Sequence, residues 1–293
     1  RVVKETRIKM LKDILTRVGD DEKAVSKFTF DTNLNNGGWG TNEDANEELH
    51  KILEKQYIFS YSKPVRLIAK LIQTINNRDA IILDFFSGSA TTAHAVMQLN
   101  AEDGGKRKFI MVQLPEKTDE KSEAFKAGYK NICEIGKERI RRAGEKIKEE
   151  AGLNGQDLDI GFRVLKLDSS NMKDIYYSAD EYDQGMLENM QLNTKEDRTD
   201  LDLLFGCLVD WGLELDKPYT TKVINSHKVH IYNDGDLVAC FEKDLDMKTI
   251  DEIAKLQALR VVFSDNSFVD SATKINVAEH FKMIAPDTDI KII

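Results

Sequence analysis

The amino-acid sequence predicts an α/β protein with two folded parts: a Rossmann-like core, and a second, smaller α/β domain at the C-terminal end. Two observations predict this. A strand, a small-residue loop, a helix and a second strand follow one another between Ala80 and Leu114, and strands alternate with helices again over residues 200–293. With 293 residues, of which 41% are hydrophobic, the chain can bury the cores of both parts.

The first part, residues 61–165, has the most regular pattern. Pro64 suits the first turn of an amphipathic helix, whose apolar stripe consists of Leu67, Ile68, Leu71, Ile72 and Ile75. Ala80–Phe86 is an apolar run broken only by Asp84, which predicts a strand buried on both faces. The other elements expected here are a helix over Thr91–Leu99, a strand over Lys108–Leu114, a long basic helix over about Glu123–Glu150 and a strand over Phe162–Leu167.

Three further segments complete the expected organisation. Residues 1–60 begin with a charged stretch and a polar loop and end in a helix over about Glu43–Glu54, with Asn42 or Asp44 as its cap. Residues 166–199 form an acidic linker, and residues 200–293 form the smaller domain. Its expected elements are a helix over Asp202–Trp211, hairpin strands over Lys228–Tyr232 and Leu237–Glu242, a helix over Lys248–Gln257, a strand over Leu259–Phe263, a helix over Lys274–Ile284 and a strand over Thr288–Ile293.

The net charge of −9 is unevenly distributed. Between Asp180 and Asp216 there are eleven acidic and two basic residues, so the rest of the chain is neutral overall. Between Lys117 and Lys148 there are ten basic and six acidic residues. A basic segment beside an acidic one is compatible with nucleic-acid binding through one face of the molecule.

The composition also excludes several classes of protein. Cys133, Cys207 and Cys240 lie far apart and form no Cys-x-x-Cys pair, which fits a reduced cytoplasmic protein and disfavours a disulfide scaffold. The five histidines show no ligand spacing, so no metal site is expected. No apolar run reaches the roughly 18–20 residues of a membrane helix, so no membrane association is expected.

The loop after the first strand has the chemistry of a ligand site. Asp84 ends the strand, Ser87-Gly88-Ser89-Ala90 lets a ligand approach the backbone, and a helix opens with Thr91-Thr92. The free amides of that helix start favour a carboxylate or phosphate, and Asp84 can accept from an ammonium group. An amino-acid moiety satisfies both, which favours S-adenosylmethionine. A Rossmann-like turn without a ligand is the alternative, and a dinucleotide site is disfavoured because Gly-x-Gly-x-x-Gly is absent.

The run Leu83–Val96, with Lys63-Pro64 about 20 residues before it, resembles amino-DNA methyltransferases of the β arrangement, in which the catalytic motif precedes the cofactor motifs. Further runs are similar to the modification (Mod) subunit of type III restriction-modification systems. They are Leu99–Ile110, Val112–Glu116, Ile135–Gly144 and Gly161–Asp168, and Phe263–Phe268 with Lys274–Val277 resembles the C-terminal domain of that family. The likeness covers most of residues 60–293.

The resemblance implies a partial S-adenosylmethionine-dependent methyltransferase core over residues 61–165. The cofactor-binding residues that it implies are Lys63, Pro64, Asp84, Phe85, Phe86, Ser87, Gly88, Ser89, Thr91 and Thr92, with Gln113 and Leu114 beside the ribose or adenine. Three positions depart from the family pattern. Phe85 stands where Pro is frequent, Ala90 where Gly is common, and Gln113 where Glu is frequent, so that Glu116 is a possible substitute.

The catalytic motif of such adenine methyltransferases, Asp-Pro-Pro-Tyr, is absent. It binds the amine of a flipped-out base and stacks on the base. The four prolines are Pro64, Pro115, Pro218 and Pro286, and no two are adjacent. No catalytic residue is therefore assigned, and we expect the chain to be inactive alone. Because it begins with Arg1 rather than Met, we expect an excised fragment whose residues 1–60 are the tail of a target-recognition region and a connecting helix.

The basic helix predicts DNA contacts through Lys137, Arg139, Arg141 and Arg142, and the alternative is a solvated helix face with ion pairs along it. The resemblance implies double-stranded DNA, a second Mod subunit and a type III restriction (helicase–nuclease) subunit as partners. We weigh three functions. They are part of an adenine-N6 DNA methyltransferase, a non-catalytic assembly fragment with a weak or empty cofactor pocket, and a nucleotide-binding oxidoreductase, which the missing glycine fingerprint disfavours.

Overall fold

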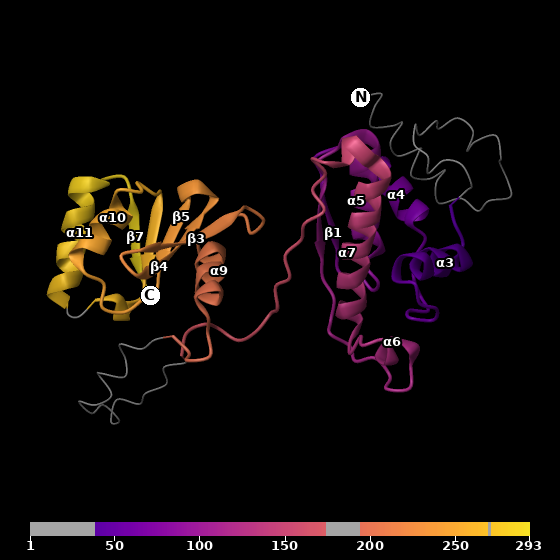
Figure 1. Ribbon diagram of the computed structural model, residues 1–293, viewed down its shortest axis with the longest axis horizontal. Coiled ribbons are helices and arrows are strands. Elements are labelled where there is room, and N and C mark those ends of the chain that lie inside the picture. Colours follow the sequence, from indigo (N-terminus) through magenta and orange to yellow (C-terminus); the bar gives the residue numbers. More distant parts are fainter. Residues whose placement is uncertain (1–38, 174–193, 269–270) are drawn as a thin grey trace. The chain divides into compact units, whose positions relative to one another are not determined.

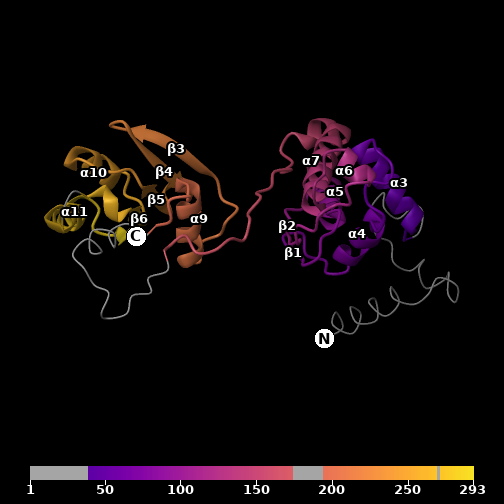
Figure 2. The ribbon, with the colours of Figure 1, turned by 90° about the horizontal axis from the view of Figure 1, so that it is seen from below.

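The computed structural model describes residues 39–173, 194–268 and 271–293 (Figures 1 and 2). The chain divides into two compact units, Arg1–Gly161 and Phe162–Ile293, and each is described by itself below. Much of the expected target-recognition tail, residues 1–38, and most of the expected acidic linker, residues 174–193, lie outside the described residues.

In the first unit, a two-stranded parallel sheet is flanked by helices (Figure 1). Strands β1 (Ile81–Asp84) and β2 (Lys108–Met111) pair with Ile81 opposite Lys108 and Asp84 opposite Met111. The remaining elements are α3 (Asn42–Leu53), α4 (Val65–Gln73), α5 (Thr91–Asp103), α6 (Glu123–Lys126), α7 (Ile132–Ala151) and a short 3₁₀ turn over Gly152–Gly155. The predicted strand–loop–helix–strand order is confirmed.

Helices α4 and α5 cover one face of the β1–β2 sheet. Val65, Ala69 and Ile72 of α4 pack with Ala95, Val96 and Leu99 of α5, and Ile82 and Phe109 from the two strands point into this cluster. The other face is open, because Ile81, Leu83 and Ile110 are 63%, 49% and 50% exposed. The prediction of a strand buried on both faces is therefore wrong for β1. A parallel sheet is normally covered on both sides, and no described element covers the second side here.

The second unit is a five-stranded mixed sheet in the order β3-β4-β5-β6-β7. Strands β3 (Tyr219–Ile224), β4 (His227–Tyr232) and β5 (Leu237–Cys240) are antiparallel, and β5, β6 (Arg260–Phe263) and β7 (Asp289–Ile292) are parallel. The helices are α9 (Asp200–Asp210), α10 (Met247–Ala254) and α11 (Ser271–Ile284), and short 3₁₀ turns lie at Asn233–Gly235 and Asp265–Ser267.

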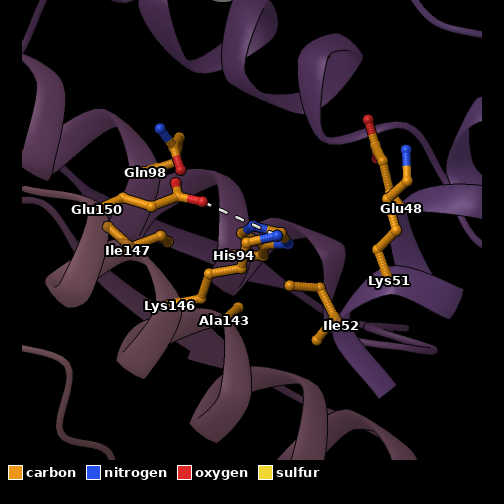
Figure 3. A pocket seen from close by; sticks show the side chains of 9 residues that line it. All are labelled: Glu48, Lys51, Ile52, His94, Gln98, Ala143, Lys146, Ile147 and Glu150. Carbon is orange, nitrogen blue, oxygen red and sulfur yellow. Dashed lines mark ion pairs between the residues drawn. The ribbon is translucent and has the colours of Figure 1, made fainter. Parts of the chain in front are cut away.

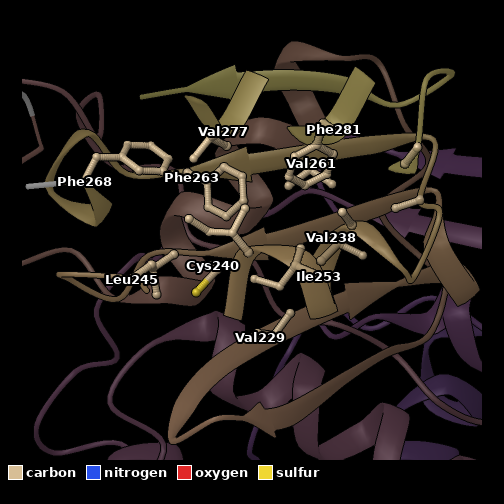
Figure 4. Close-up of a cluster of buried hydrophobic side chains, with 14 residues drawn as sticks. Val229, Val238, Cys240, Leu245, Ile253, Val261, Phe263, Phe268, Val277 and Phe281 are labelled. Carbon is tan, nitrogen blue, oxygen red and sulfur yellow. The ribbon is translucent and has the colours of Figure 1, made fainter. Parts of the chain in front are cut away.

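Both faces of this second sheet are covered. Val238, Cys240, Val261 and Phe263 pack with residues of α10 and α11, and Figure 4 shows the rings of Phe263, Phe268 and Phe281 meeting in this cluster. The alternate strand positions, Leu237, Ala239 and Val262, pack with Leu204, Cys207 and Leu208 of α9. The alternation follows from the two-residue period of a strand, which sends neighbouring side chains to opposite faces.

Most expected elements of the second unit are confirmed, with a hairpin turning at Asn233–Gly235 as predicted. Strand β3 was not predicted. The predicted strand Phe162–Leu167 is wrong, because these residues have no regular structure. Arg163 instead donates to the backbone carbonyls of Leu215 and Lys217 and lies over the ring of Phe205.

Two predictions about helices of the first unit also need correction. The long basic helix is two helices, α6 and α7, because Gly128 adopts a left-handed backbone (φ +98°) between them. Helix α3 lies where expected, but its cap is Thr41, whose hydroxyl accepts from the Asp44 amide while the Asp44 carboxylate accepts from the Thr41 amide. Asp44 therefore serves in the third helical position of a capping box.

No helix within residues 39–173, 194–268 and 271–293 combines the length and the apolar character that a membrane span requires.

The open face of the first sheet predicts unequal costs for matched substitutions on β1. We expect Leu83→Thr to change the free energy of unfolding by less than about 0.5 kcal/mol, because this side chain is half exposed. Ile82→Thr should cost about 2 kcal/mol, because it removes apolar contacts with α4 and α5 and places a hydroxyl there. Urea unfolding followed by circular dichroism measures both, and equal costs would show that the second face is covered in solution.

Candidate cofactor-binding site

The candidate site lies in the loop that connects β1 to α5. Asp84 ends the strand, and its carboxylate accepts a hydrogen bond of 2.6 Å from the Thr92 hydroxyl and one of 3.3 Å from the Phe86 amide. One side chain therefore ties the end of the strand to the first turn of the helix. The intervening loop, residues 85–90, is held at both of its ends by this carboxylate.

Two residues of the loop have left-handed backbone. Gly88 (φ +51°) meets this requirement without strain, and Ala90 (φ +60°, ψ +39°), which precedes α5, carries the cost of its Cβ. The Ala90 amide donates to the Ser87 carbonyl at 2.7 Å, so the turn is closed. The left-handed backbone at Ala90 gives a physical reason for the glycine that is common at this position in the family that the sequence resembles.

Gln113 braces the loop from β2. Its Oε1 accepts from the Gly88 amide at 2.7 Å, and its Nε2 donates to the Leu114 carbonyl at 3.2 Å. Nearby, the Ser87 amide donates to the Val112 carbonyl at 3.1 Å. Gln113 therefore lies at the loop, as the sequence predicts, but its side-chain oxygen is occupied by the backbone of Gly88.

The Lys63-Pro64 segment meets the loop through its neighbour Ser62. The Ser62 hydroxyl lies 3.1 Å from that of Ser89, and both are buried. Pro64 precedes helix α4, and the first amide of that helix, Val65, donates to the Glu48 carboxylate at 3.0 Å. Lys63 is exposed, as are Phe85, Phe86 and Leu114. The structure thus brings the two implied halves of the pocket together, with exposed side chains around them.

Arg139 contacts the loop rather than the surface. It is fully buried, and its Nη1 donates to the hydroxyls of Ser62 and Ser89 at 2.9 Å and of Thr91 at 2.7 Å. The prediction that Arg139 binds DNA phosphates is therefore wrong in this structure. The sequence does contain the signal: Ile135, Arg139, Ala143 and Ile147 are four residues apart, which places the arginine inside the buried stripe of α7.

The other three basic residues of that prediction lie on α7 beside carboxylates. Lys137 pairs with Glu134 at 2.6 Å, Arg142 with Glu138 at 2.7 Å, and Arg141 with Glu138 at 3.5 Å. This is the ion-paired helix face of the alternative interpretation. Contact of these residues with DNA stays a prediction.

Glycine at position 136 lets α7 approach the loop. A Cβ built on Gly136 would lie 3.4 Å from both the Ala90 Cβ and the Gly88 carbonyl oxygen, at the close end of ordinary van der Waals contact. Helix α7 therefore supports the loop by direct backbone contact at Gly136 and by hydrogen bonds from Arg139 one turn later.

These residues suit the methionine end of S-adenosylmethionine. No side chain caps the N-terminus of α5, so its first amides are available to a carboxylate. The Asp84 carboxylate accepts two hydrogen bonds and keeps further lone pairs for an ammonium group. The loop residues Ser87, Gly88 and Ser89 are small; Ser89 is buried, and a Cβ on Gly88 would lie 3.3 Å from the Phe59 ring. Within the described part of the chain, no cluster of His, Cys, Asp and Glu side chains is arranged to hold a metal ion.

A separate pocket of about 150 Å³ lies between α3, α5 and α7 (Figure 3). Glu48, Lys51, His94, Gln98, Lys146 and Glu150 contribute its polar lining, and Lys146 pairs with Glu150 at 3.9 Å. Burial, reinforced by the charges of Arg139 and Lys146, lowers the pKa of His94 to about 3, so this histidine is neutral near neutral pH. None of the loop residues 84–92 lines this pocket.

Comparison with known proteins finds matches that include the candidate site. Residues 12–145 match a family model described as DNA methylase. The chain is 36% identical over 162 residues to the type III restriction-modification enzyme StyLTI Mod subunit of Salmonella typhimurium, covering 53% of this chain and 24% of that protein. It is 29% identical over 258 residues to the EcoP15I Mod subunit of Escherichia coli, covering 85% of this chain and 37% of that protein.

A match of another type is 39% identity over 93 residues to the type II methyltransferase M.KpnI of Klebsiella pneumoniae, covering 32% of this chain and 22% of that protein. The alignments thus span between 18% and 37% of the length of the curated relatives.

The backbone of Ala90 allows a direct test of the loop. We expect Ala90→Gly to raise the free energy of unfolding by up to about 1 kcal/mol, because glycine adopts the left-handed conformation without the penalty that a Cβ brings. Ala101→Gly, within α5, is the matched control. It should lower the free energy of unfolding by about 1 kcal/mol, since Ala101 is helical. Chemical unfolding measures both changes. Similar losses at the two positions would contradict the left-handed turn.

Proposed function

We propose that the first unit of the chain, in which residues 12–145 match the DNA methylase family model, binds S-adenosylmethionine for methyl transfer to an amino group of DNA. The observation that carries the proposal is the turn from β1 into α5. There, the Asp84 carboxylate and an uncapped helix start lie within one loop of small residues.

In the proposed complex, the two ends of the loop bind different groups of the cofactor. The first amides of α5 bind the carboxylate of the methionine group, where the helix dipole also favours an anion. Asp84 accepts from the ammonium group while its bond to Thr92 keeps the carboxylate oriented. Bound there, the cofactor supplies a methyl group on a positively charged sulfur, which a nucleophilic amine can attack in line.

The adenosine end is proposed to lie toward the end of β2. Gln113 keeps one Nε2 hydrogen and one lone pair of its oxygen for the ribose, because its other groups contact the Gly88 amide and the Leu114 carbonyl. Leu114 is exposed beside it and supplies an apolar surface for the adenine. Phe85 and Phe86, which are 64% and 79% exposed, directly follow β1 and offer further apolar surface.

We further propose that the chain acts as part of an adenine-N6 methyltransferase (modification) subunit of a type III system. Its sequence has no Asp-Pro-Pro-Tyr motif, so the group that binds the target base must come from a segment outside these 293 residues. The open face of the β1–β2 sheet supports this, since no element among the described residues covers it and a parallel sheet is normally covered on both sides. The alternative is a non-catalytic assembly fragment with an empty cofactor pocket.

The second unit, in this proposal, is the assembly domain. Its sheet is covered on both faces, so further contacts fall to exposed apolar residues such as Val209, Ile275 and Met283. The partners that we propose are double-stranded DNA, a second Mod subunit and a type III restriction subunit. The thiols of Cys133, Cys207 and Cys240 are all free, which supports a reducing cytoplasmic setting.

Calorimetric titration tests the cofactor assignment. We expect the chain to bind S-adenosylmethionine, and Asp84→Asn to weaken binding by about tenfold or more, because a neutral amide no longer pairs with the ammonium group. Asp79→Asn, at an exposed position just before β1, is the matched control and should leave the affinity unchanged. Binding of NAD in place of S-adenosylmethionine would support an oxidoreductase, and no binding of either would support the assembly fragment.

A methyl-transfer assay tests whether the chain needs a catalytic motif from another polypeptide. With labelled S-adenosylmethionine and duplex DNA, the chain alone is expected to transfer no methyl group although it binds the cofactor. Adding a polypeptide that carries the Asp-Pro-Pro-Tyr segment of a type III modification subunit should restore transfer. Methylation of DNA by the chain alone would contradict the proposal, because it would require a catalytic motif within these residues.

A further inference from the structure

Arg139 is the largest fully buried side chain of the described residues, and it is charged. Its Nη1 makes all of its hydrogen bonds to neutral hydroxyls, and its Nε and Nη2 have no hydrogen-bond partner among the described residues. Burial lowers the pKa of this guanidinium to about 10, while the carboxylate of Glu48 opposes the shift. The group therefore stays charged at neutral pH without a directly bonded carboxylate.

Stability does not account for such a residue. A buried charge has a large desolvation cost that neutral hydroxyls offset only in part, and an apolar side chain of similar volume is often equally or more stabilising. The neighbouring buried positions of α7 are apolar, namely Ile135, Ile140, Ala143 and Ile147. A methionine at position 139 would continue that stripe. The guanidinium must therefore be explained by the hydroxyls that it contacts.

Those three hydroxyls belong to the two segments that form the candidate site. Ser62 precedes Lys63-Pro64, Ser89 lies in the loop, and Thr91 is the first residue of α5. Ser62 also lies 3.1 Å from Ser89. Because a guanidinium only donates and Nη1 carries two hydrogens, the three oxygens face one nitrogen and share its two N–H groups as acceptors. One buried side chain thus fixes Ser89 and Thr91 on both sides of the strained turn at Ala90.

The charge of Arg139 and the dipole of α5 also have the same sign at this point. The positive end of the helix dipole and a buried guanidinium both lie beside the first turn of α5. Two like charges in a low dielectric destabilise each other, and a bound anion relieves both. A ligand carboxylate at the helix start would offset both positive charges.

We propose that Arg139 is a positioning residue that holds the loop in the shape, and at the positive potential, required to bind the carboxylate of an amino-acid-bearing nucleoside. The inference rests on the proposed function and deepens it. It assigns selectivity for the amino-acid end of the ligand to a residue that acts through Ser89 and Thr91 and does not touch the ligand itself.

Two ligands separate this role from a merely structural one. S-adenosylhomocysteine carries the amino-acid group, and 5′-methylthioadenosine has the same nucleoside and sulfur without it. By calorimetry on the full chain, we expect Arg139→Met to weaken binding of S-adenosylhomocysteine by about tenfold or more. Binding of 5′-methylthioadenosine should change by less than about threefold. Arg139→Lys keeps the charge and should restore part of the selectivity.

Lys148→Met, on the same helix, is the matched control and should change neither affinity. If Arg139→Met does not fold, Ser89→Ala combined with Thr91→Val removes two acceptors and should produce the same selective loss. Equal weakening of both ligands, or no weakening of either, would overturn the proposal. Failure of the unmodified chain to bind S-adenosylhomocysteine would instead overturn the proposed function.

Discussion

The hydrogen bond between Asp84 and Thr92 is the contact on which the site depends. At 2.6 Å it joins the last residue of β1 to the first turn of α5 and fixes where the loop between them can run. The other features follow from that constraint. Six residues must turn between two fixed ends, so the backbone is left-handed at Gly88 and Ala90, and the helix start is left without a side-chain cap. A strained, uncapped turn of this kind is costly for folding and suited to a ligand.

Two supports from distant parts of the sequence hold this turn in place. Gln113 accepts from the Gly88 amide after β2, and Arg139 donates to Ser89 and Thr91 from α7. Both are buried or half-buried polar contacts, so removing either side chain takes a hydrogen-bond partner away from the loop. The first unit therefore has a loop that is held from two sides, and a sheet whose second face, among the described residues, exposes Ile81, Leu83 and Ile110.

Patterns with a fixed period were predictable from sequence, and contacts across the fold were not. The alternation of strand and helix residues located β1, α5, β2 and most of the second unit, because apolar periodicity reports burial directly. The break in the long basic helix at Gly128 was not predictable, because a single glycine carries little weight against a helical pattern. Phe162–Leu167 has the composition of a strand, but Arg163 bonds to carbonyls after α9 and no described strand pairs with it.

Within the candidate site, the chemistry of the sequence predicts the loop residues, which stay a prediction, but it does not predict that Arg139 contacts that loop. A run of basic residues predicts an exposed face, and only the four-residue spacing with Ile135, Ala143 and Ile147 distinguishes the one that turns inward. The open second face of the β1–β2 sheet was missed for a related reason. An apolar run predicts burial, but it does not say whether the covering element lies within the same chain.

Hydrogen–deuterium exchange on the full chain, with and without S-adenosylhomocysteine, measures the central claim most directly. If the turn from β1 into α5 takes the amino-acid end of the ligand, exchange should slow at the amides of residues 88–93 and stay unchanged in α3 and in the last turns of α7. Protection concentrated at residues 48–52 and 146–150, which line the separate pocket between α3, α5 and α7, would contradict the account. So would ligand binding without any change at residues 88–93.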